Sequence, residues 1–311
     1  MELKKMNIIM GPQRSGKTTL LRLLFNAVYA RLNGLDTTRD LYDMAYNYLT
    51  GKLRDGSITL EICNEEKYDY DKEECRETML KLKCAGGEEE MSCDVEGKSP
   101  FEGVVFIPTE FEALIKYALL PLSEPYEALR TYYLNLLRLG VRLGVMKLEV
   151  KQEKKLGILD EAFKEVAIKR GRIIEAVDGA EIDISYSSSY VTTLYLLRII
   201  LDKVPDNSLI LIDNIDSYLH PEAMEKLALM LWKLAESNTV VVATHDLIFE
   251  ETLIHADNYA KKYGVDVHVD FDDIALTVLR PWRECIKKDP RTSVIDTYTD
   301  VFRDLYPELY G

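Results

Sequence analysis

Nine residues near the N-terminus have the composition of a phosphate-binding loop: Gly11, Pro12, Gln13, Arg14, Ser15, Gly16, Lys17, Thr18 and Thr19. The first eight of them fit the pattern G-x-x-x-x-G-K-[ST] in full. The glycines allow a tight turn in which successive backbone N–H groups face inward as an anion site. Lys17 is expected to reach the β- and γ-phosphates, Thr18 to bind magnesium and Thr19 to lie beside the α-phosphate. The loop therefore predicts that the chain binds ATP with Mg²⁺.

A second group of polar residues follows two apolar stretches in the last third of the chain. Asp213 ends the stretch Leu209–Asp213, where a carboxylate can hold Mg²⁺ through water. His245 follows 32 residues later, just after the apolar stretch 239–243. A neutral imidazole there can bond a γ-phosphate or the attacking water, although a histidine taken alone is more often a buried or surface residue.

Three serines, Ser187, Ser188 and Ser189, stand directly before a predicted helix that runs to about residue 201. Hydroxyls and open N–H groups at a helix N-terminus favour an anion. The alternative is a serine cap that binds no ligand.

Apolar stretches that alternate with helical patterns must position these groups. Strands are predicted at 6–10, 104–107, 209–213 and 239–243, and helices at 16–31 and 221–235. Continuously apolar strands alternating with helices indicate a parallel sheet covered on both faces. Further strands are expected at 57–62, 91–97, 172–176 and 181–185, with a mainly helical block at 112–172 and a short helix at 300–306.

Composition narrows the class of protein. The 311 residues carry a net charge of -14 and no apolar run of membrane-spanning length, so no membrane insertion and a cytoplasmic location are expected. Residues 61–96 hold 13 acidic and 5 basic side chains, which disfavours nucleic acid there. Residues 126–172 hold 11 basic and 6 acidic side chains, which form either a solvated face or a surface for an acidic partner or nucleic acid. The five cysteines include no C-x₂-C pair, which favours free thiols over a zinc site.

The order of these motifs resembles that of the ABC-type ATPases, especially the stand-alone soluble branch related to chromosome-maintenance and DNA-repair ATPases. The matching blocks are the loop 11–18, the serine-rich segment 184–190, the pair Ile212-Asp213, the segment 217–221 and His245. The resemblance covers residues 3–31, about 101–111, and 172–250. It implies that Ser187, Ser188 and Ser189 bind the γ-phosphate of ATP held by an opposite subunit.

Three departures from the family pattern stand out. Asn214 occupies the place of the usual catalytic glutamate, and because asparagine cannot accept a proton, slow hydrolysis is expected, with Asp216 as a substitute acceptor. No glutamine follows a strand as in the family, which leaves Thr109 or Glu110 to contact the metal's water. Tyr190 replaces the usual signature glycine.

The fold class predicted is α/β, a P-loop NTPase of ABC-ATPase type with a mixed sheet covered by helices and a helical lid. The expected core spans 1–111 and 172–250, with an acidic insertion of hairpins at 36–100, a lid at 112–171 and a C-terminal appendage at 251–311. The leading hypothesis is an ATP-driven homodimerisation switch acting on an unidentified protein partner, with Lys17, His245, Asn214 and Asp216 at the catalytic centre. A nucleotide-sensing scaffold with negligible hydrolysis and a P-loop kinase are the alternatives.

Overall fold

The computed structural model describes these parts of the chain: 3–13, 15–34, 57–63, 68–69, 74–75, 78–86, 91–109, 166–169, 172–177, 179–183, 193–194, 197, 204–279 and 286–291. The helix predicted at 300–306, most of the predicted lid and the serines Ser187, Ser188 and Ser189 lie outside these ranges.

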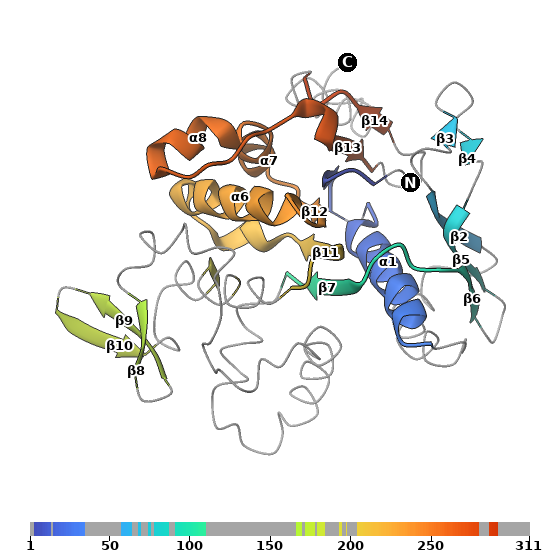
Figure 1. The fold of residues 1–311 in the computed structure, drawn as a ribbon, viewed down its shortest axis with the longest axis horizontal. Helices are drawn as coiled ribbons and strands as arrows, with labels where there is room; N and C mark the ends of the chain where they lie inside the picture. The colour runs from blue at the N-terminus through green and yellow to red at the C-terminus, as the bar shows by residue number, and fades with distance from the viewer. Residues whose placement is uncertain are drawn as a thin grey trace, which may run out of the picture.

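A six-stranded sheet forms the centre of the described structure, in the order β14-β13-β1-β12-β11-β7 (Figure 1). Its strands are β1 (Met6–Met10), β7 (Gly103–Ile107), β11 (Ser208–Asp213), β12 (Thr239–Ala243), β13 (Ile274–Val278) and β14 (Ile286–Lys288). All neighbouring pairs are parallel except β13 and β14, so the sheet is mixed, as the sequence predicts.

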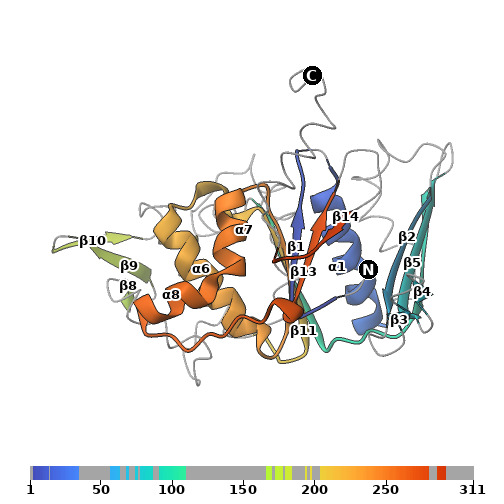
Figure 2. The same ribbon diagram turned by 90° about the horizontal axis from the view of Figure 1, so that it is seen from above.

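Helices cover both faces of this sheet. Helix α1 (Lys17–Leu32) lies on one face, and α6 (Pro221–Ala235), α7 (Leu247–Ile254) and α8 (Ala256–Tyr263) lie on the other (Figure 2). Successive residues of β1 are buried on opposite faces of the sheet. Ile9 packs in the hydrophobic cluster with α1, and Ile8 packs in the cluster with α6. Burial of each such side chain stabilises the fold by roughly 1.5–3 kcal/mol. No helix in the described ranges is long and apolar enough to cross a membrane.

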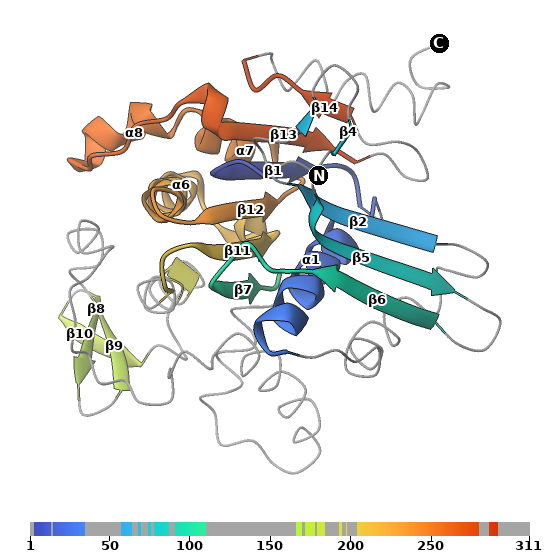
Figure 3. The ribbon, with the colours of Figure 1, turned by 45° about the vertical axis from the view of Figure 1, so that its right-hand side comes forward.

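A three-stranded antiparallel sheet lies on the far side of α1 (Figure 3). It consists of β2 (Ser57–Cys63), β5 (Thr78–Gly86) and β6 (Met91–Gly97), with β5 in the middle. Four of its residues are buried in the same cluster as α1: Leu60, Ile62, Leu80 and Leu82. A short pair, β3 (Tyr68–Asp69) and β4 (Glu74–Cys75), lies within the same stretch of sequence. The described residues of this stretch therefore form antiparallel strand pairs.

A second small antiparallel sheet contains β8 (Val166–Lys169), β9 (Arg172–Val177) and β10 (Ala180–Asp183). Strands β9 and β10 confirm the two strands that the sequence predicts on either side of the turn at Gly179. Strand β8 lies at the end of the range expected to be helical, so a helical assignment that extends through residue 169 is wrong. Its Val and Ile residues favour a strand, and pairing with β9 decides the outcome.

The C-terminal boundary of the core also differs from the boundary predicted at residue 250. The chain continues through α8 and the short 3-10 helix η6 (Phe271–Asp273) into β13. Strand β13 pairs with β1 along its whole length, from Met6 beside Ile274 to Met10 beside Val278. Residues 251–279 therefore belong to the core rather than to an appendage. The sequence pattern hides this, because β13 is short and alternates buried with half-buried residues.

Candidate functional site

The predicted phosphate loop joins the carboxyl end of β1 to the start of α1. At Gly11, φ is 148°, and a Cβ atom there would lie 2.5 Å from the Leu279 carbonyl oxygen. At Gly16, φ is 97°, although a Cβ atom there would have open space around it. Gly11 is therefore required for close packing as well as for conformation, and Gly16 for conformation alone.

Helix α1 begins without a capping side chain. Its N-cap residue is Gly16, and its first turn contains no acidic residue. Thr18 and Thr19 are half-buried on that turn. The first N–H groups of a helix have no partner within the helix and carry partial positive charge, so this end of α1 is suited to an anion.

Lys17 is folded into the loop rather than extended into solvent. Its Nζ donates to the carbonyl oxygens of Gly11 at 2.6 Å and Pro12 at 3.0 Å, and the residue is 6 % exposed. Burial lowers the pKa of Lys17 from its ordinary value, and the carboxylates of Asp213 and Asp216 offset part of this effect. The lysine thus lies in the field of both acids that the sequence singles out.

Asp213 lies at the carboxyl end of β11, two strands from β1. The residue is 2 % exposed, and its register partner on β12 is Ala243, which pairs in turn with Ile9 of β1. The phosphate loop and Asp213 therefore lie at the same end of the sheet, beyond the carboxyl ends of its parallel strands. Ligand-binding groups commonly lie at this end of such sheets. Thr109 follows β7 at the same end, whereas Glu110 and Arg14 lie outside the described residues.

Two side-chain pairs connect the segment after β11 to the segment after β12. Thr244 Oγ1 donates to Asp216 Oδ2 at 2.7 Å, and His245 Nδ1 lies 3.1 Å from Asn214 Oδ1. An amide oxygen only accepts, so the second contact favours the histidine tautomer that carries its proton on Nδ1. The structure therefore brings Asn214, Asp216 and His245 into one cluster.

Asp216 is fully buried in the short 3-10 helix η5 (Ile215–Tyr218), and its Oδ1 has no hydrogen-bond partner among the described residues. Burial raises the pKa of Asp216 to about 6, while the Thr244 hydrogen bond and the nearby His245 act to lower it. A carboxyl group with such a pKa changes protonation close to neutral pH, as a proton acceptor in catalysis does.

Asn214 has an unusual backbone conformation. Its φ and ψ are 46° and 38°, and its N–H donates to the Ala243 carbonyl oxygen at 2.8 Å. Asparagine tolerates this left-handed region better than most residues. The residue type at position 214 thus suits both the turn and the contact with His245.

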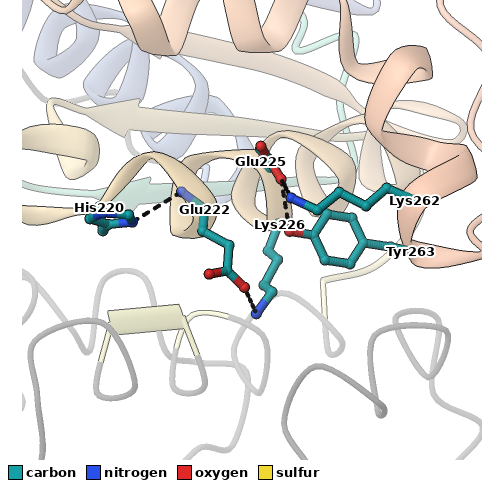
Figure 4. A network of polar contacts seen from close by, with 6 residues as sticks. All are labelled: His220, Glu222, Glu225, Lys226, Lys262 and Tyr263. Atoms are coloured by element: carbon teal, nitrogen blue, oxygen red, sulfur yellow. Dashed lines mark hydrogen bonds and ion pairs between the residues drawn. The ribbon is translucent and has the colours of Figure 1, made fainter.

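The chain then enters α6 at His220, whose Nδ1 accepts from the Glu222 N–H at 3.4 Å. Figure 4 shows this contact and, further along the helix, a network that links α6 to α8. Glu225 Oε2 accepts from Lys262 Nζ at 2.6 Å and from the Tyr263 hydroxyl at 2.8 Å. Burial raises the pKa of Glu225, but these two hydrogen bonds outweigh it and hold the pKa below its ordinary value. The network fixes α8 on α6.

Sequence reasoning missed two contributors to the site. The Leu279 carbonyl restricts Gly11 from the far end of the described core, and no local pattern signals it. Thr244 did have a signal, because it stands between an apolar strand and His245. Its bond to Asp216, however, depends on the pairing of β11 with β12.

Comparison with known proteins adds a family match over part of the chain. A family model described as an AAA domain, putative AbiEii toxin, type IV toxin–antitoxin system, matches residues 189–249. This range runs from Ser189 through β11, α6 and β12 to the start of α7. No curated protein matches the chain.

Solved structures to which this chain is similar include SMC head domains and a transporter ATPase. A structure of SmcHead bound to the C-winged helix domain of ScpA is 11% identical, with a TM-score of 0.48, and covers 96% of this chain and 93% of that chain. The SMC head domain from Thermotoga maritima is 12% identical, with a TM-score of 0.47 and coverage of 92% and 91%. The protein cbiO1 from Clostridium perfringens, part of the ABC transporter complex cbiONQ, is 13% identical, with a TM-score of 0.39 and coverage of 98% and 85%.

The fold and the motif order agree on one class of protein. The mainly parallel sheet carries the phosphate loop after β1 and the carboxylate of Asp213 at the end of β11. The family match covers Asp213 but not the loop. The chain has the fold of a P-loop NTPase, and its motifs resemble those of the stand-alone ABC-type ATPases related to the chromosome-maintenance branch.

Proposed function

We propose that this chain binds ATP with Mg²⁺ at the Gly11–Thr19 loop, hydrolyses it slowly, and uses ATP binding to dimerise and act on a partner. The proposal rests on one observation: the loop, the buried Lys17 and the buried Asp213 lie together at the carboxyl ends of the parallel strands. This arrangement offers N–H donors and an ammonium group to phosphates, and a carboxylate to the metal that accompanies them.

The chemistry of the site suits Mg²⁺. Thr18 supplies a hydroxyl on the first turn of α1, and Asp213 supplies a buried carboxylate. Magnesium prefers oxygen ligands and is usually held by one or two such protein groups together with waters and phosphate oxygens. The bound ion would neutralise charge on the phosphates, and Lys17 would do the same from within the loop.

Slow turnover is proposed from the residues around the expected γ-phosphate position. Asn214 cannot accept a proton, and its side-chain oxygen contacts His245. Asp216 is the proposed acceptor instead, since a pKa of about 6 leaves its carboxyl group mostly ionised at neutral pH. His245 is exposed and is oriented by Asn214, which suits it to bond a phosphate oxygen or the attacking water.

Dimerisation is proposed from the family resemblance. Two protomers would hold ATP between the Gly11–Thr19 loop of one and Ser187, Ser188 and Ser189 of the other, and closure would move the region 112–171. The basic region 126–172 suits a partner with acidic groups, either a protein or a nucleic-acid backbone.

A nucleotide-sensing scaffold is the second candidate, and the contact between Asn214 and His245 favours it. Such a protein would bind ATP and dimerise with negligible turnover. Measuring phosphate release and dimerisation in the same sample separates the two, because brisk release by the wild type rules the scaffold out.

Sedimentation velocity tests the dimerisation switch. The wild type is run without nucleotide, with MgATP and with a non-hydrolysable analogue, beside the variant Ser189→Arg. We expect nucleotide to convert wild-type monomers to dimers, whereas Ser189→Arg binds ATP yet stays monomeric because the bulky cation blocks the facing site. A Ser189→Arg protein that still dimerises with ATP would show that this serine does not act across the interface. Ser189→Ala is the matched control, because it removes the hydroxyl without adding bulk.

A further inference from the structure

The small sheet on the far side of α1 places two cysteines opposite each other. Cys84 of β5 and Cys93 of β6 are register partners in an antiparallel pair. The neighbouring pairs on either side, Lys83 beside Asp94 and Ala85 beside Ser92, keep the same register. The pairing is therefore a regular part of the sheet, and the phosphate site involves neither cysteine.

Strand geometry brings these two residues within the range of a disulfide. Directly opposite residues of antiparallel strands have Cα atoms about 4.5 or 5.5 Å apart, depending on the hydrogen-bonding pattern. Disulfide-linked residues have Cα atoms about 4.4–6.8 Å apart, so both separations are compatible with a bond. Cβ atoms of opposite residues lie about 4.5–5.5 Å apart, whereas a disulfide needs about 3.5–4.5 Å. The strands must therefore approach each other slightly, which makes such a bond easier to reduce.

Register separates this pair from the other cysteines that the structure describes. Cys63 is paired with Thr78, and Cys75 is paired with Tyr68. Neither of them faces another cysteine, and Cys285 lies outside the described residues. Among the described cysteines, Cys84 and Cys93 are thus the pair whose backbone positions favour a disulfide between neighbouring strands.

We propose that Cys84 and Cys93 are a redox modification site, at which the two thiols are converted reversibly to a cross-strand disulfide. The oxidant is a low-molecular-weight disulfide such as oxidised glutathione. One cysteine thiolate attacks this disulfide, forms a mixed disulfide and releases one glutathione thiolate. The second cysteine thiolate then displaces the other glutathione and closes the protein disulfide. Two protein thiols lose two electrons and two protons, and one oxidised glutathione becomes two reduced molecules.

The bond would act on the sheet that covers α1. Leu80 and Leu82 of β5 are buried in the α1 cluster, so β5 packs directly on α1. The Arg31 guanidinium, at the end of α1, donates to the Val95 carbonyl oxygen, two residues from position 93. Oxidation would therefore tie together the two strands that contact the end of α1.

Redox titration of the full-length protein tests the site. The wild type is equilibrated in glutathione buffers from fully reduced to fully oxidised, quenched with an alkylating agent and cleaved after glutamate. Cleavage at Glu88 to Glu90 separates the two cysteines, so only a disulfide keeps their peptides joined. We expect the joined peptide in oxidising buffer, with the loss of two hydrogen atoms, and its disappearance after dithiothreitol treatment.

Single substitutions provide the controls. Cys84→Ser should abolish the joined peptide, whereas Cys75→Ser should leave it unchanged. Separate glutathione adducts at positions 84 and 93, or a link from either to another cysteine, would overturn the proposal. The wild-type peptide map decides the matter by itself if a serine variant fails to fold, and none of these outcomes depends on ATP binding.

Discussion

At the scale of single residues, the site depends on charges that are buried together. Lys17 donates to two loop carbonyls and lies in the field of Asp213 and Asp216, which limits the fall in its pKa caused by burial. Such a cluster holds an ammonium group inside the loop, where phosphate oxygens would take the place of the carbonyl acceptors. The sequence identifies these three residues, because each follows an apolar strand or the glycine-bounded loop. It does not show that Asp216 is bonded to Thr244 rather than exposed.

Replacing Asn214 tests how far this residue limits turnover. We expect Asn214→Glu to raise the steady-state rate of phosphate release by up to roughly 100-fold, because it supplies a proton acceptor at this position. The gain should stay at the low end of general-base effects, since glutamate tolerates φ near 46° less well than asparagine.

Asn214→Gln is the matched control, because it has the size of glutamate without a basic oxygen. Equal rates for the two variants would mean that proton acceptance at position 214 does not limit turnover. A wild-type rate already as high as that of Asn214→Glu would instead remove the reason to regard this chain as a slow ATPase.

At the scale of elements, α7 carries a buried glutamate whose carboxyl group lacks hydrogen-bond partners among the described residues. Glu250 is fully buried, and neither of its carboxyl oxygens has a hydrogen-bond partner among the described residues. Burial raises the pKa of Glu250 to about 9, and the neighbouring Glu251 adds to the shift. The helix is held in place by other contacts: Asp246 caps its first turn, and Trp232 of α6 donates to the Leu253 carbonyl oxygen at 2.7 Å.

The buried acid predicts a loss of stability as pH rises. The folded state keeps the proton of Glu250 up to about pH 9, whereas the unfolded chain loses it near pH 4.5. The contribution of Glu250 to the free energy of unfolding is therefore fully present below about pH 4.5. It declines as the pH rises toward 9, and the loss is about 3 kcal/mol at neutral pH. Glu250→Gln should remove this decline, so thermal unfolding across pH should show the variant gaining on the wild type as pH increases.

Glu251→Gln provides the control, since it makes the same substitution at a partly exposed neighbouring position. If the melting temperatures of the wild type and Glu250→Gln changed with pH in the same way, burial would not be holding the carboxyl group of Glu250 neutral.

The elements nearest the site could be predicted closely from the sequence. Residues 6–10, 221–235 and 239–243 match β1, α6 and β12, because continuous apolar runs and a proline at a helix start are strong local signals. Strand β8 and strand β13 could not be placed in this way. Strand β13 forms because β1, at the other end of the described core, pairs with it, which local periodicity does not reveal. Strand β8 has only four residues, too few to show a period, and it forms by pairing with the adjacent β9.

At the scale of the whole molecule, the described core is a series of layers: α6–α8, the six-stranded sheet, α1 and the small β2-β5-β6 sheet (Figure 2). The layers explain how a short loop is kept in place. Strand β1 lies between β12 and β13, and the N–H of Leu279 donates to the Met10 carbonyl oxygen just before Gly11. The sequence predicts the sheet and its covering helices, but it ends the core too early because β13 has no strong pattern of its own.

Isothermal titration of MgATP into the full-length protein tests the central claim, that the Gly11–Thr19 loop binds the nucleotide's phosphates. The account predicts binding by the wild type and a loss of at least roughly 100-fold in affinity for Lys17→Ala, because charged hydrogen bonds to phosphate are lost. Lys262→Ala, which removes a lysine of α8 that donates to Glu225 of α6, should bind as the wild type does. Unchanged affinity in Lys17→Ala, or no binding by the wild type, would contradict the account.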